Sequence, residues 1–169
     1  MQDRINHTTG LYNTDLFEVL FNHEVARSKR YPSPISLLRL GIVLDNPSHT
    51  DSEIWESATL NVAHVLNSSL RQVDVPAHCD DNFWVLLPAT EEEGAKIVAK
   101  RLIERLSIEQ VTRSNHHFWM GLCIGLASHA GGPTLAAGEL MVQASHALEE
   151  AIKCGRNVMV TYRELVRID

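Results

Sequence analysis

The stretch HCDDNFWVLLP, residues 78–88, places two aspartates and an asparagine directly before a run of apolar residues. Residues 73–78 and 83–87 each have the length and composition of a short strand. The CDDN segment between them, residues 79–82, is therefore expected to form a hairpin turn. Acidic side chains at such a turn can hold a metal ion, so the stretch indicates a metal site, the remnant of one, or only a polar turn.

On both sides of this hairpin, apolar residues recur with the periods of helices and strands. Before it we expect a helix at residues 14–30, a buried strand at 35–43 and a helix at 52–69; after it we expect a helix from Thr90, a strand at 116–127, a helix at 136–154 and a last strand at 158–162. After the first helix the order is β-α-β-β-α-β, followed by α-β. This order predicts an α+β fold (an α/β sandwich) of the split βαβ type, with helices packed on a mostly antiparallel sheet.

The helix after the hairpin carries its own start signal. Thr90 and Glu93 have the spacing of a capping box, and Ile97, Val98 and Leu102 follow a helical period. We therefore expect Thr90 to cap this helix and the three apolar side chains to face the core.

Composition and charge exclude several classes of protein. The chain has 169 residues, 44% hydrophobic and 21% charged, which fits one soluble globular domain. A formal net charge of −6 disfavours broad binding to nucleic acid or to an anionic membrane. We expect no membrane insertion, because the start lacks a signal-peptide pattern and no apolar run reaches the roughly 18 residues of a membrane span. Cys79, Cys123 and Cys154 are an odd number without metal-type spacing, which favours reduced thiols and a cytoplasmic location.

Four segments, spread over nearly the whole chain, carry a family resemblance. They are TTGLYN (8–13), RQVD (71–74) with the hairpin that follows, IGLA (124–127) and ASHALEEAIKCGRN (144–157). In the same order they are similar to LTGLxN, to R-x-x-D with GGDEF, to SIGVA and to ADxALYxAKxxGRN, the signatures of GGDEF domains, which are diguanylate cyclases of bacterial signalling. The resemblance implies that residues 1–169 form a single GGDEF-like domain with a nucleotidyl-cyclase-like sheet. It also implies a piece of a longer multidomain protein, in which an EAL phosphodiesterase is one candidate neighbour.

Active members of this family join two GTP molecules into cyclic di-GMP, and they use Mg²⁺ to neutralise phosphate charge and activate the attacking hydroxyl. The resemblance places Gly41 where the first metal-binding aspartate stands in the family, and Val43 at the next such position. Cys79 and Asp80 replace the two glycines of the hairpin. The acidic third position survives as Asp81, whereas the fourth is Asn82.

The nucleotide-binding parts of the family pattern are also changed. The guanine-binding loop is replaced by a shorter segment at residues 46–56, which leaves Glu56 as an acidic contact. Ile152 stands where the family has a lysine, and Arg156 and Lys153 are the remnants of a phosphate-binding group.

These differences indicate a catalytically degenerate domain. Asp81 alone is a poor cage for Mg²⁺, so we expect no cofactor. Asp80 adds a negative charge where a triphosphate approaches, and like charges about 4 Å apart repel by roughly 4 kcal/mol at an effective dielectric near 20. The hairpin is then the remnant of a metal site, and the domain is expected to act as a regulatory module that binds cyclic di-GMP.

Two alternatives stay open. In the first, a shift of strand register lets Asp45 replace the missing ligand beside Asp81, and the domain is an active cyclase that uses Mg²⁺. Such a shift reverses the face to which each side chain of the strand points. In the second, the domain binds no nucleotide and serves in dimerisation or docking, as a homodimer or with other domains of its parent protein.

The R-x-x-D segment survives, and the resemblance makes it the inhibitory site that binds the product. Arg71 and Asp74 match the motif, and Arg101 falls on the helix position that adds a second arginine. Arginine can fork onto guanine or phosphate oxygens, and aspartate can accept from the N–H edge of guanine. The alternative is a solvated surface pair worth less than about 1 kcal/mol. One residue fewer than in the family separates Asp74 from the hairpin, so the pair could be rotated off its platform.

Histidines and tryptophans give weaker signals. His116 and His117 are adjacent on an expected strand, so they point to opposite faces and cannot easily share a zinc ion. Trp84 and Trp119 lie on expected core strands, which favours packing over base stacking.

Arg39 interrupts the apolar strand at residues 35–43. A charged side chain within a buried strand needs a partner or an exposed edge. We expect Arg39 to pair with Asp45 or Glu56, or to face solvent at the edge of the sheet.

Overall fold

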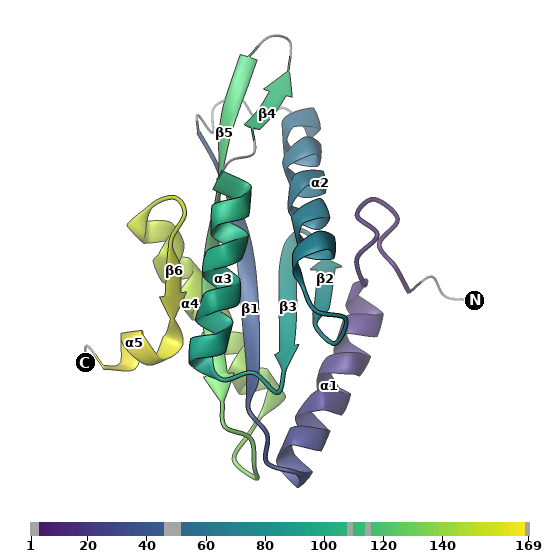
Figure 1. Cartoon of the computed structure of the whole chain (residues 1–169), viewed down its shortest axis with the longest axis vertical. Coiled ribbons are helices and arrows are strands. Elements are labelled where there is room, and N and C mark those ends of the chain that lie inside the picture. Colours follow the sequence, from purple (N-terminus) through teal and green to yellow (C-terminus); the bar gives the residue numbers. More distant parts are fainter. Residues whose placement is uncertain (1–3, 46–51, 108–109, 114–115, 168–169) are drawn as a thin grey trace.

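Figure 1 shows the fold of the chain in a computed structural model, which describes residues 4–45, 52–107, 110–113 and 116–167. In chain order the elements are α1 (Thr14–Arg30), β1 (Ile35–Leu44), α2 (Ser52–Ser69), β2 (Val75–Cys79), β3 (Asn82–Pro88), α3 (Glu92–Ser107), β4 (Gln110–Arg113), β5 (His116–His129), α4 (Ala137–Cys154), β6 (Met159–Thr161) and α5 (Tyr162–Val166). Every predicted helix and strand is present, and α2 has the predicted bounds. β4 and α5 have no counterpart among the predicted elements.

The strands form one six-stranded sheet. Its order is β2-β3-β1-β5-β4, and β6 pairs with β5 beside this path. Among the described strands every pair is antiparallel except the parallel pair of β5 with β6. The predicted α+β fold with a mostly antiparallel sheet is therefore confirmed.

Alternate side chains of the central strand β1 enter two separate cores, because successive side chains of a strand point to opposite faces. Leu38 and Leu40 belong to the core beneath α2 and α3. Ile35 and Leu37 belong to the core shared with α1 and α4. Figure 1 shows α2 and α3 in front of the sheet and α4 behind it. The sheet is thus covered on both faces, and its binding surfaces must lie at strand ends and helix borders.

The helix α4 lies unusually close to β5. A Cβ atom added at Gly125 would lie 2.2 Å from the backbone oxygen of Ala144 and 2.2 Å from the backbone nitrogen of Leu148. Real Cβ atoms do not approach backbone this closely, so the packing requires glycine at this position. Gly125 therefore fixes the distance between α4 and the sheet.

The aromatic side chains of α1 connect this helix to the sheet. Asn13 caps the helix, because its side-chain oxygen accepts a hydrogen bond from the backbone N–H of Leu16 at 3.1 Å. Phe17 stacks on Phe21 with 5.7 Å between ring centroids and on Trp84 of β3 with 6.2 Å. The predicted packing role of Trp84 is confirmed, since only 7% of it is exposed.

The hairpin is tighter than predicted. β2 ends at Cys79 and β3 begins at Asn82, so the turn consists of Asp80 and Asp81 alone. Asp80 has a φ of 53°, in the left-handed region that aspartate tolerates better than most residues. Two-residue hairpin turns favour such positive φ values, which explains an aspartate where the family has glycine.

The expected start of α3 is wrong. Helix α3 begins at Glu92, and the Thr90 hydroxyl donates to the backbone oxygen of Pro88 at 2.8 Å instead of capping the helix. Ile97 is 66% exposed, whereas Leu102 is buried as predicted. The helix buries the alanines Ala95 and Ala99 in place of Ile97, because small side chains let it lie close to the sheet.

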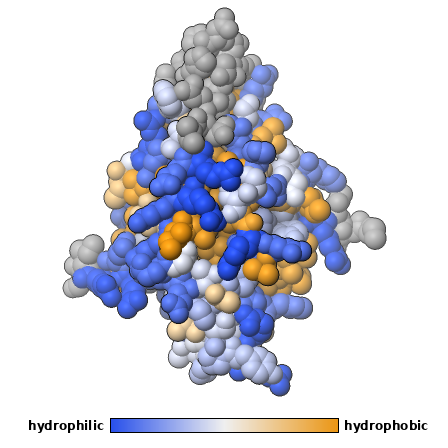
Figure 2. Space-filling view, viewed as in Figure 1, coloured by the Kyte–Doolittle hydropathy of each residue, from blue (hydrophilic) through white to orange (hydrophobic). Residues whose placement is uncertain are grey.

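The surface over α2 and α3 carries both hydrophobic and hydrophilic residues. Figure 2 shows that, over the described part of this face, hydrophobic residues are divided into small groups by hydrophilic ones. No helix among the described residues is long and apolar enough to cross a membrane.

Candidate functional site

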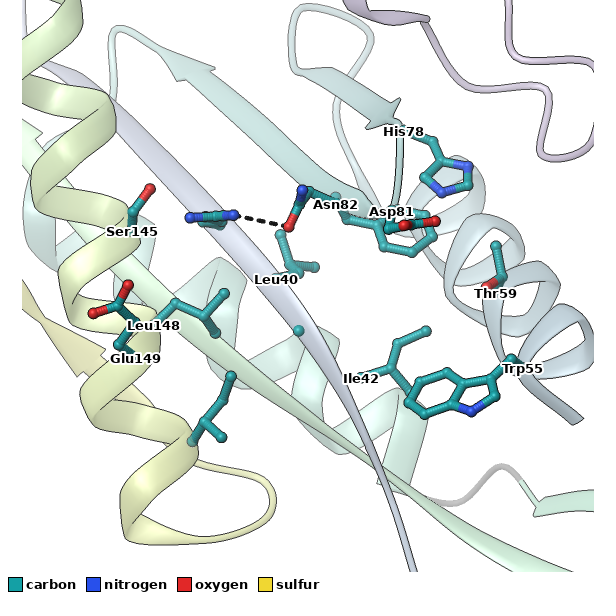
Figure 3. Close-up of a pocket in the computed structure, with 14 residues that line it drawn as sticks. Leu40, Ile42, Trp55, Thr59, His78, Asp81, Asn82, Ser145, Leu148 and Glu149 are labelled. Carbon is teal, nitrogen blue, oxygen red and sulfur yellow. Dashed lines mark hydrogen bonds between the residues drawn. The ribbon is translucent and has the colours of Figure 1, made fainter. Parts of the chain in front are cut away.

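A pocket opens where β1 runs beyond β3. The last pair between these strands joins Leu40 to Phe83, whereas β1 continues to pair with β5 as far as Leu44. The cavity beside this step has a volume of about 520 Å³. Figure 3 shows its floor and its two helical walls, formed by Leu40 and Ile42 of β1, Trp55 and Thr59 of α2, and Leu148 and Glu149 of α4.

Gly41 lies in this pocket at the position where the family resemblance places the first metal ligand. A Cβ atom at Gly41 would lie 3.3 Å from Cδ1 of Leu148 and 3.4 Å from Cδ1 of Ile152. The first distance is slightly shorter than an ordinary van der Waals contact, and the second is at its lower limit. A carboxylate at this position would lie beside apolar side chains, which solvate a charge poorly.

The acidic hairpin residues lie at the rim. Asp80 and Asp81 are both exposed, and Asp81 lines the pocket. Asn82 is partly buried, and its side-chain oxygen accepts a hydrogen bond from Nη2 of Arg39 at 2.8 Å. Figure 3 shows Asp81 and Asn82 on the side of the pocket opposite Ser145 and Glu149. The rim is therefore acidic, and the floor next to it is cationic.

Asp45 does not join Asp81. Its carboxylate forms an ion pair with Nη1 of Arg156, and it is not among the residues that line the pocket. The Arg156 side chain lies over Gly121, where an added Cβ atom would be 2.1 Å from its Cγ. The predicted pairing of Arg39 with Asp45 or Glu56 is wrong, because within the described chain Arg39 bonds Asn82 and neither carboxylate.

The predicted phosphate-binding remnants are both held by carboxylates of the same chain. Arg156 pairs with Asp45, and Nζ of Lys153 lies 2.6 Å from Oε1 of Glu150. The second ion pair raises the pKa of Lys153 and lowers the pKa of Glu150. Neither cation lines the pocket, so the structure does not bring them together with Asp81.

The residues present do not fit the Mg²⁺ that the family's chemistry uses. Among the described residues, no group of three or more His, Cys, Asp and Glu side chains is placed to hold a metal ion. Mg²⁺ prefers octahedral oxygen ligands and is usually bound through one or two carboxylates together with substrate phosphates. Asp81 is the acidic hairpin side chain that lines the pocket, and the other carboxylate among the described lining residues, that of Glu149, lies on the opposite side.

Arg39 is the central cation of the pocket. Its guanidinium carbon lies 5.2 Å from the centroid of a Trp84 ring, a cation–π distance. Its Nε atom is buried and has no hydrogen-bond partner. Leaving a buried donor unpaired costs about 1–3 kcal/mol, so this arginine is held in place at the expense of stability.

His78 is a titratable group that lines the pocket, and its pKa is lowered. Its ring stacks on Phe83 with 4.4 Å between centroids, and its buried Nδ1 atom has no partner. Burial lowers the pKa of His78, and the nearby charges of Asp81 and Asp80 oppose this effect. The imidazole is thus held toward its neutral form.

The R-x-x-D segment forms a closed turn at the end of α2. Nη2 of Arg71 lies 2.9 Å from Oδ1 of Asp74, and the backbone N–H of Arg71 donates to Oδ2 at 2.8 Å. Nη2 of Arg71 also donates to the hydroxyl of Thr90 at 2.8 Å. The Asp74 side chain is fully covered, whereas that of Arg71 is 53% exposed. The pair is therefore a built turn with a cation on its surface.

Two arginines of α3 reach the same end of α2. Arg101 donates to the backbone oxygen of Ser69 at 2.8 Å, and Arg105 donates to its hydroxyl at 2.6 Å. The structure thus brings Arg101 to Ser69, two residues before Arg71. Arg105 was not predicted, although its spacing of four residues from Arg101 places both on one helix face.

Other predicted features have mixed outcomes. Trp119 is 49% exposed, so the prediction that it packs in the core is wrong. All three cysteines are free, and burial raises the pKa of Cys79 and Cys123. The side chains of His116 and His117, and residues 46–51 of the predicted guanine loop, lie outside what the structure describes.

Comparison with known proteins gives one family. The profile of "Diguanylate cyclase, GGDEF domain" matches residues 57–158. A search of curated proteins finds no match.

Several solved structures have the same fold. The GGDEF domain of DgcB from Caulobacter crescentus, in complex with c-di-GMP, is 18% identical with a TM-score of 0.84, over 96% of this chain and 95% of that one. The FimX GGDEF domain from Pseudomonas aeruginosa is 19% identical with a TM-score of 0.80, over 94% and 99%. The active GGEEF domain of a diguanylate cyclase from Vibrio cholerae is 22% identical with a TM-score of 0.72, over 84% and 91%. At these identities the likeness establishes the fold.

Proposed function

The chain belongs to the GGDEF diguanylate cyclase family, and from this premise we propose that it is a non-catalytic member that acts as a regulatory module in cyclic di-GMP signalling. In this proposal it binds the dinucleotide at the turn of Arg71 and Asp74 together with Arg101. Its output passes to other domains of a parent protein, an EAL domain among the candidates, or to a second copy of the chain.

The observation that carries the proposed loss of catalysis is the missing carboxylate at Gly41. The position lacks a carboxylate, and Leu148 and Ile152 lie against the space that a side chain there would occupy. Cyclisation of GTP needs a metal to neutralise charge on the phosphates. Asp81 alone does not supply the ligands for it, so we expect no turnover.

The phosphate side of the pocket supports the same conclusion. Arg156 and Lys153 are already paired with Asp45 and Glu150. A triphosphate would have to displace these carboxylates and also approach the exposed charges of Asp80 and Asp81. Each of these contacts opposes binding of a highly charged anion.

The arginine cluster at the end of α2 supports dinucleotide binding. Arg71 is half exposed, and Arg101 and Arg105 lie on the surface around Ser69. Forked guanidinium groups match phosphate oxygens and the O6 and N7 edge of guanine. The similar DgcB domain is seen in complex with c-di-GMP, which makes this ligand the first to test.

Asp74 has a different part in this proposal from the one that its motif suggests. Both of its oxygens accept hydrogen bonds from Arg71, and the side chain is fully covered. In this arrangement guanine cannot reach the carboxylate. We infer that Asp74 orients Arg71, and that the arginines make the first contacts with the ligand.

Isothermal titration with cyclic di-GMP tests the proposal. We expect micromolar binding that Arg101→Ala weakens at least about tenfold, since a charge-assisted hydrogen bond contributes about 1.5–3 kcal/mol. Arg101 is the sharper target, because Arg71→Ala would also open the turn. Arg30→Ala, on an exposed arginine of α1, is the matched control and should bind normally. Equal affinity of Arg101→Ala and the unmodified chain would refute the site.

A parallel assay addresses catalysis. The protein is incubated with GTP and Mg²⁺ or Mn²⁺, and we expect no cyclic di-GMP to form. Product that disappears in Asp81→Ala would contradict the proposal and establish an active cyclase. Concentration-dependent self-association without any ligand effect on thermal stability would instead favour a docking domain.

A further inference from the structure

We propose that the pocket between α2 and α4 binds a small organic monoanion, a carboxylate with an apolar or aromatic body, through Arg39 and Asn82 and without a metal ion. This site is distinct from the arginine cluster proposed above for cyclic di-GMP. The proposed site lies where the family's metal ligands are missing, and its ligand is an anion instead of a metal cation.

Arg39 has no carboxylate partner among the described residues. Its Nη2 atom bonds the neutral amide oxygen of Asn82, and its face rests on Trp84. Arg39 is partly buried, and a charge withdrawn from water is costly to desolvate unless a partner compensates it. An unpaired cation that lines a cavity of about 520 Å³ is therefore a group to which an anion can bind.

The guanidinium of Arg39 has N–H donors that no described residue accepts. The Nε atom is fully covered and cannot contact a ligand. The Nη1 atom makes no hydrogen bond to any described residue and is not among the covered atoms. The Nη1 atom is therefore a free donor beside the Nη2 atom that bonds Asn82, and guanidinium N–H groups fit the oxygens of a carboxylate.

The side-chain amide of Asn82 supplies further N–H donors beside Arg39. Because its oxygen accepts from Arg39, its amide nitrogen remains with two N–H donors beside the guanidinium. No described residue accepts them. An acidic side chain at this position, as the family motif has, would instead form an ion pair with Arg39 and cancel its charge. The amide thus leaves the cation free and adds a donor to the same anion.

The rest of the cavity combines apolar walls with exposed carboxylates. Its walls carry the apolar side chains of Trp55, Leu148 and Ile152, which suit a hydrophobic or planar body. Asp81 and Glu149 are exposed at the pocket and carry negative charge. They disfavour a ligand with several negative charges, such as a nucleoside triphosphate, and leave a monoanion as the best match.

The test uses benzoate and its neutral isostere benzamide as probes. ¹⁵N-labelled protein is titrated in the presence of EDTA, and the indole N–H signal of Trp55 is followed. For nine non-hydrogen atoms at ordinary ligand efficiency, we expect saturable benzoate binding with a dissociation constant on the order of 10 mM. Benzamide should bind at least about tenfold more weakly, because it cannot form the charge-assisted fork.

Two variants test the assignment to Arg39 and Asn82. Arg39→Gln removes the cation, and Asn82→Asp supplies an internal carboxylate for it; both should abolish the benzoate shift. Arg30→Gln, outside the pocket, is the control and should leave the shift unchanged. Well-dispersed amide spectra confirm that each variant is folded.

The proposal is overturned if benzoate and benzamide bind equally, if Arg39→Gln binds benzoate normally, or if no shift occurs. Titration of the same variants with cyclic di-GMP separates this site from the arginine cluster. The two sites share no residue, so loss of one ligand with retention of the other identifies which assignment has failed.

Discussion

At the scale of single residues, Asn82 sets the charge of the pocket floor. Its amide oxygen satisfies one donor of Arg39 without neutralising the guanidinium. An acidic side chain in place of this amide would neutralise the cation, so the anion site that we propose depends on the NH₂ group of Asn82. The neighbouring His78 is the second polar group at this point, and it also has a buried atom without a partner.

The buried imidazole predicts a dependence of stability on pH. Burial lowers the pKa of His78 in the folded state, so the unfolded chain binds the proton more readily. The contribution of His78 to stability is present above its unfolded pKa of about 6.5 and is lost as the pH falls below that value. Thermal unfolding from pH 8 to pH 5, followed by circular dichroism, should show a smaller loss of stability for His78→Gln than for the unmodified chain.

His23→Gln is the matched control for this measurement, because His23 is exposed on α1. It should lose stability as the unmodified chain does. Identical pH profiles for His78→Gln and the unmodified chain would contradict the assignment of this dependence to His78.

At the scale of elements, the approach of α4 to β5 shapes the pocket wall. Leu148 contacts the space above Gly41 from one side, and its backbone lies against Gly125 from the other. The two glycines lie on neighbouring strands, and both let the same turn of α4 lie close to the sheet. A shift of this helix would therefore widen the pocket and loosen the core together.

This close packing predicts a large effect of one methyl group. Gly125→Ala places a Cβ atom within 2.2 Å of the α4 backbone, so the helix must move. We expect the free energy of unfolding to fall by about 3 kcal/mol, at the upper end of the usual effect of overpacking. Urea denaturation measures it. Gly138→Ala, at a position of α4 with open space around it, is the control and should be neutral or slightly stabilising. Equal stability of the two variants would show that α4 adjusts freely.

The elements with strong local signals could be predicted from the sequence. The apolar period of α2 gives its bounds, and Asn13 before an apolar helix gives the start of α1. β4 has only four residues and no continuous apolar run, and it is a strand because it pairs with β5. The start of α3 was mispredicted because the Thr90 hydroxyl bonds Pro88, a competitor that the capping pattern does not reveal.

The two candidate sites also differ in how far local sequence could predict them. The Arg71–Asp74 turn is local in sequence, so a motif could indicate it. The bond between Arg39 and Asn82 joins residues 43 positions apart and exists because β1 and β3 pair in one register. No local pattern could predict that bond, and without it the charge at Arg39 appeared to need Asp45 or Glu56.

At the scale of the whole molecule, α2 joins the two proposed sites. Trp55 and Thr59 near its start line the pocket, and Ser69 at its end receives the α3 arginines. A helix of 18 residues is about 27 Å long, so the sites lie at opposite ends of one rigid element. The pocket and the arginine cluster are therefore separate in space but connected through the same helix.

We expect divalent metal to leave the thermal stability of the folded chain unchanged. A ligand present at 100 times its dissociation constant stabilises a protein by about 2.7 kcal/mol, which raises the melting temperature by several degrees. Because no described carboxylate cluster is placed to hold a cation, we expect the same melting temperature in excess Mg²⁺ and in EDTA. Scanning calorimetry measures the difference. A saturable rise with Mg²⁺ that Asp81→Ala removes would instead support the rebuilt metal site.

The contact between Arg39 and Trp84 gives the protein an internal optical reporter. Trp84 is buried, whereas Trp55 and Trp119 are 38% and 49% exposed, so an aqueous quencher such as iodide acts mainly on the latter two. The emission that survives quenching comes chiefly from an indole whose face carries a guanidinium. Any event that moves Arg39 changes the surroundings of that indole. The occupancy of the pocket can thus be followed by fluorescence in the unlabelled protein.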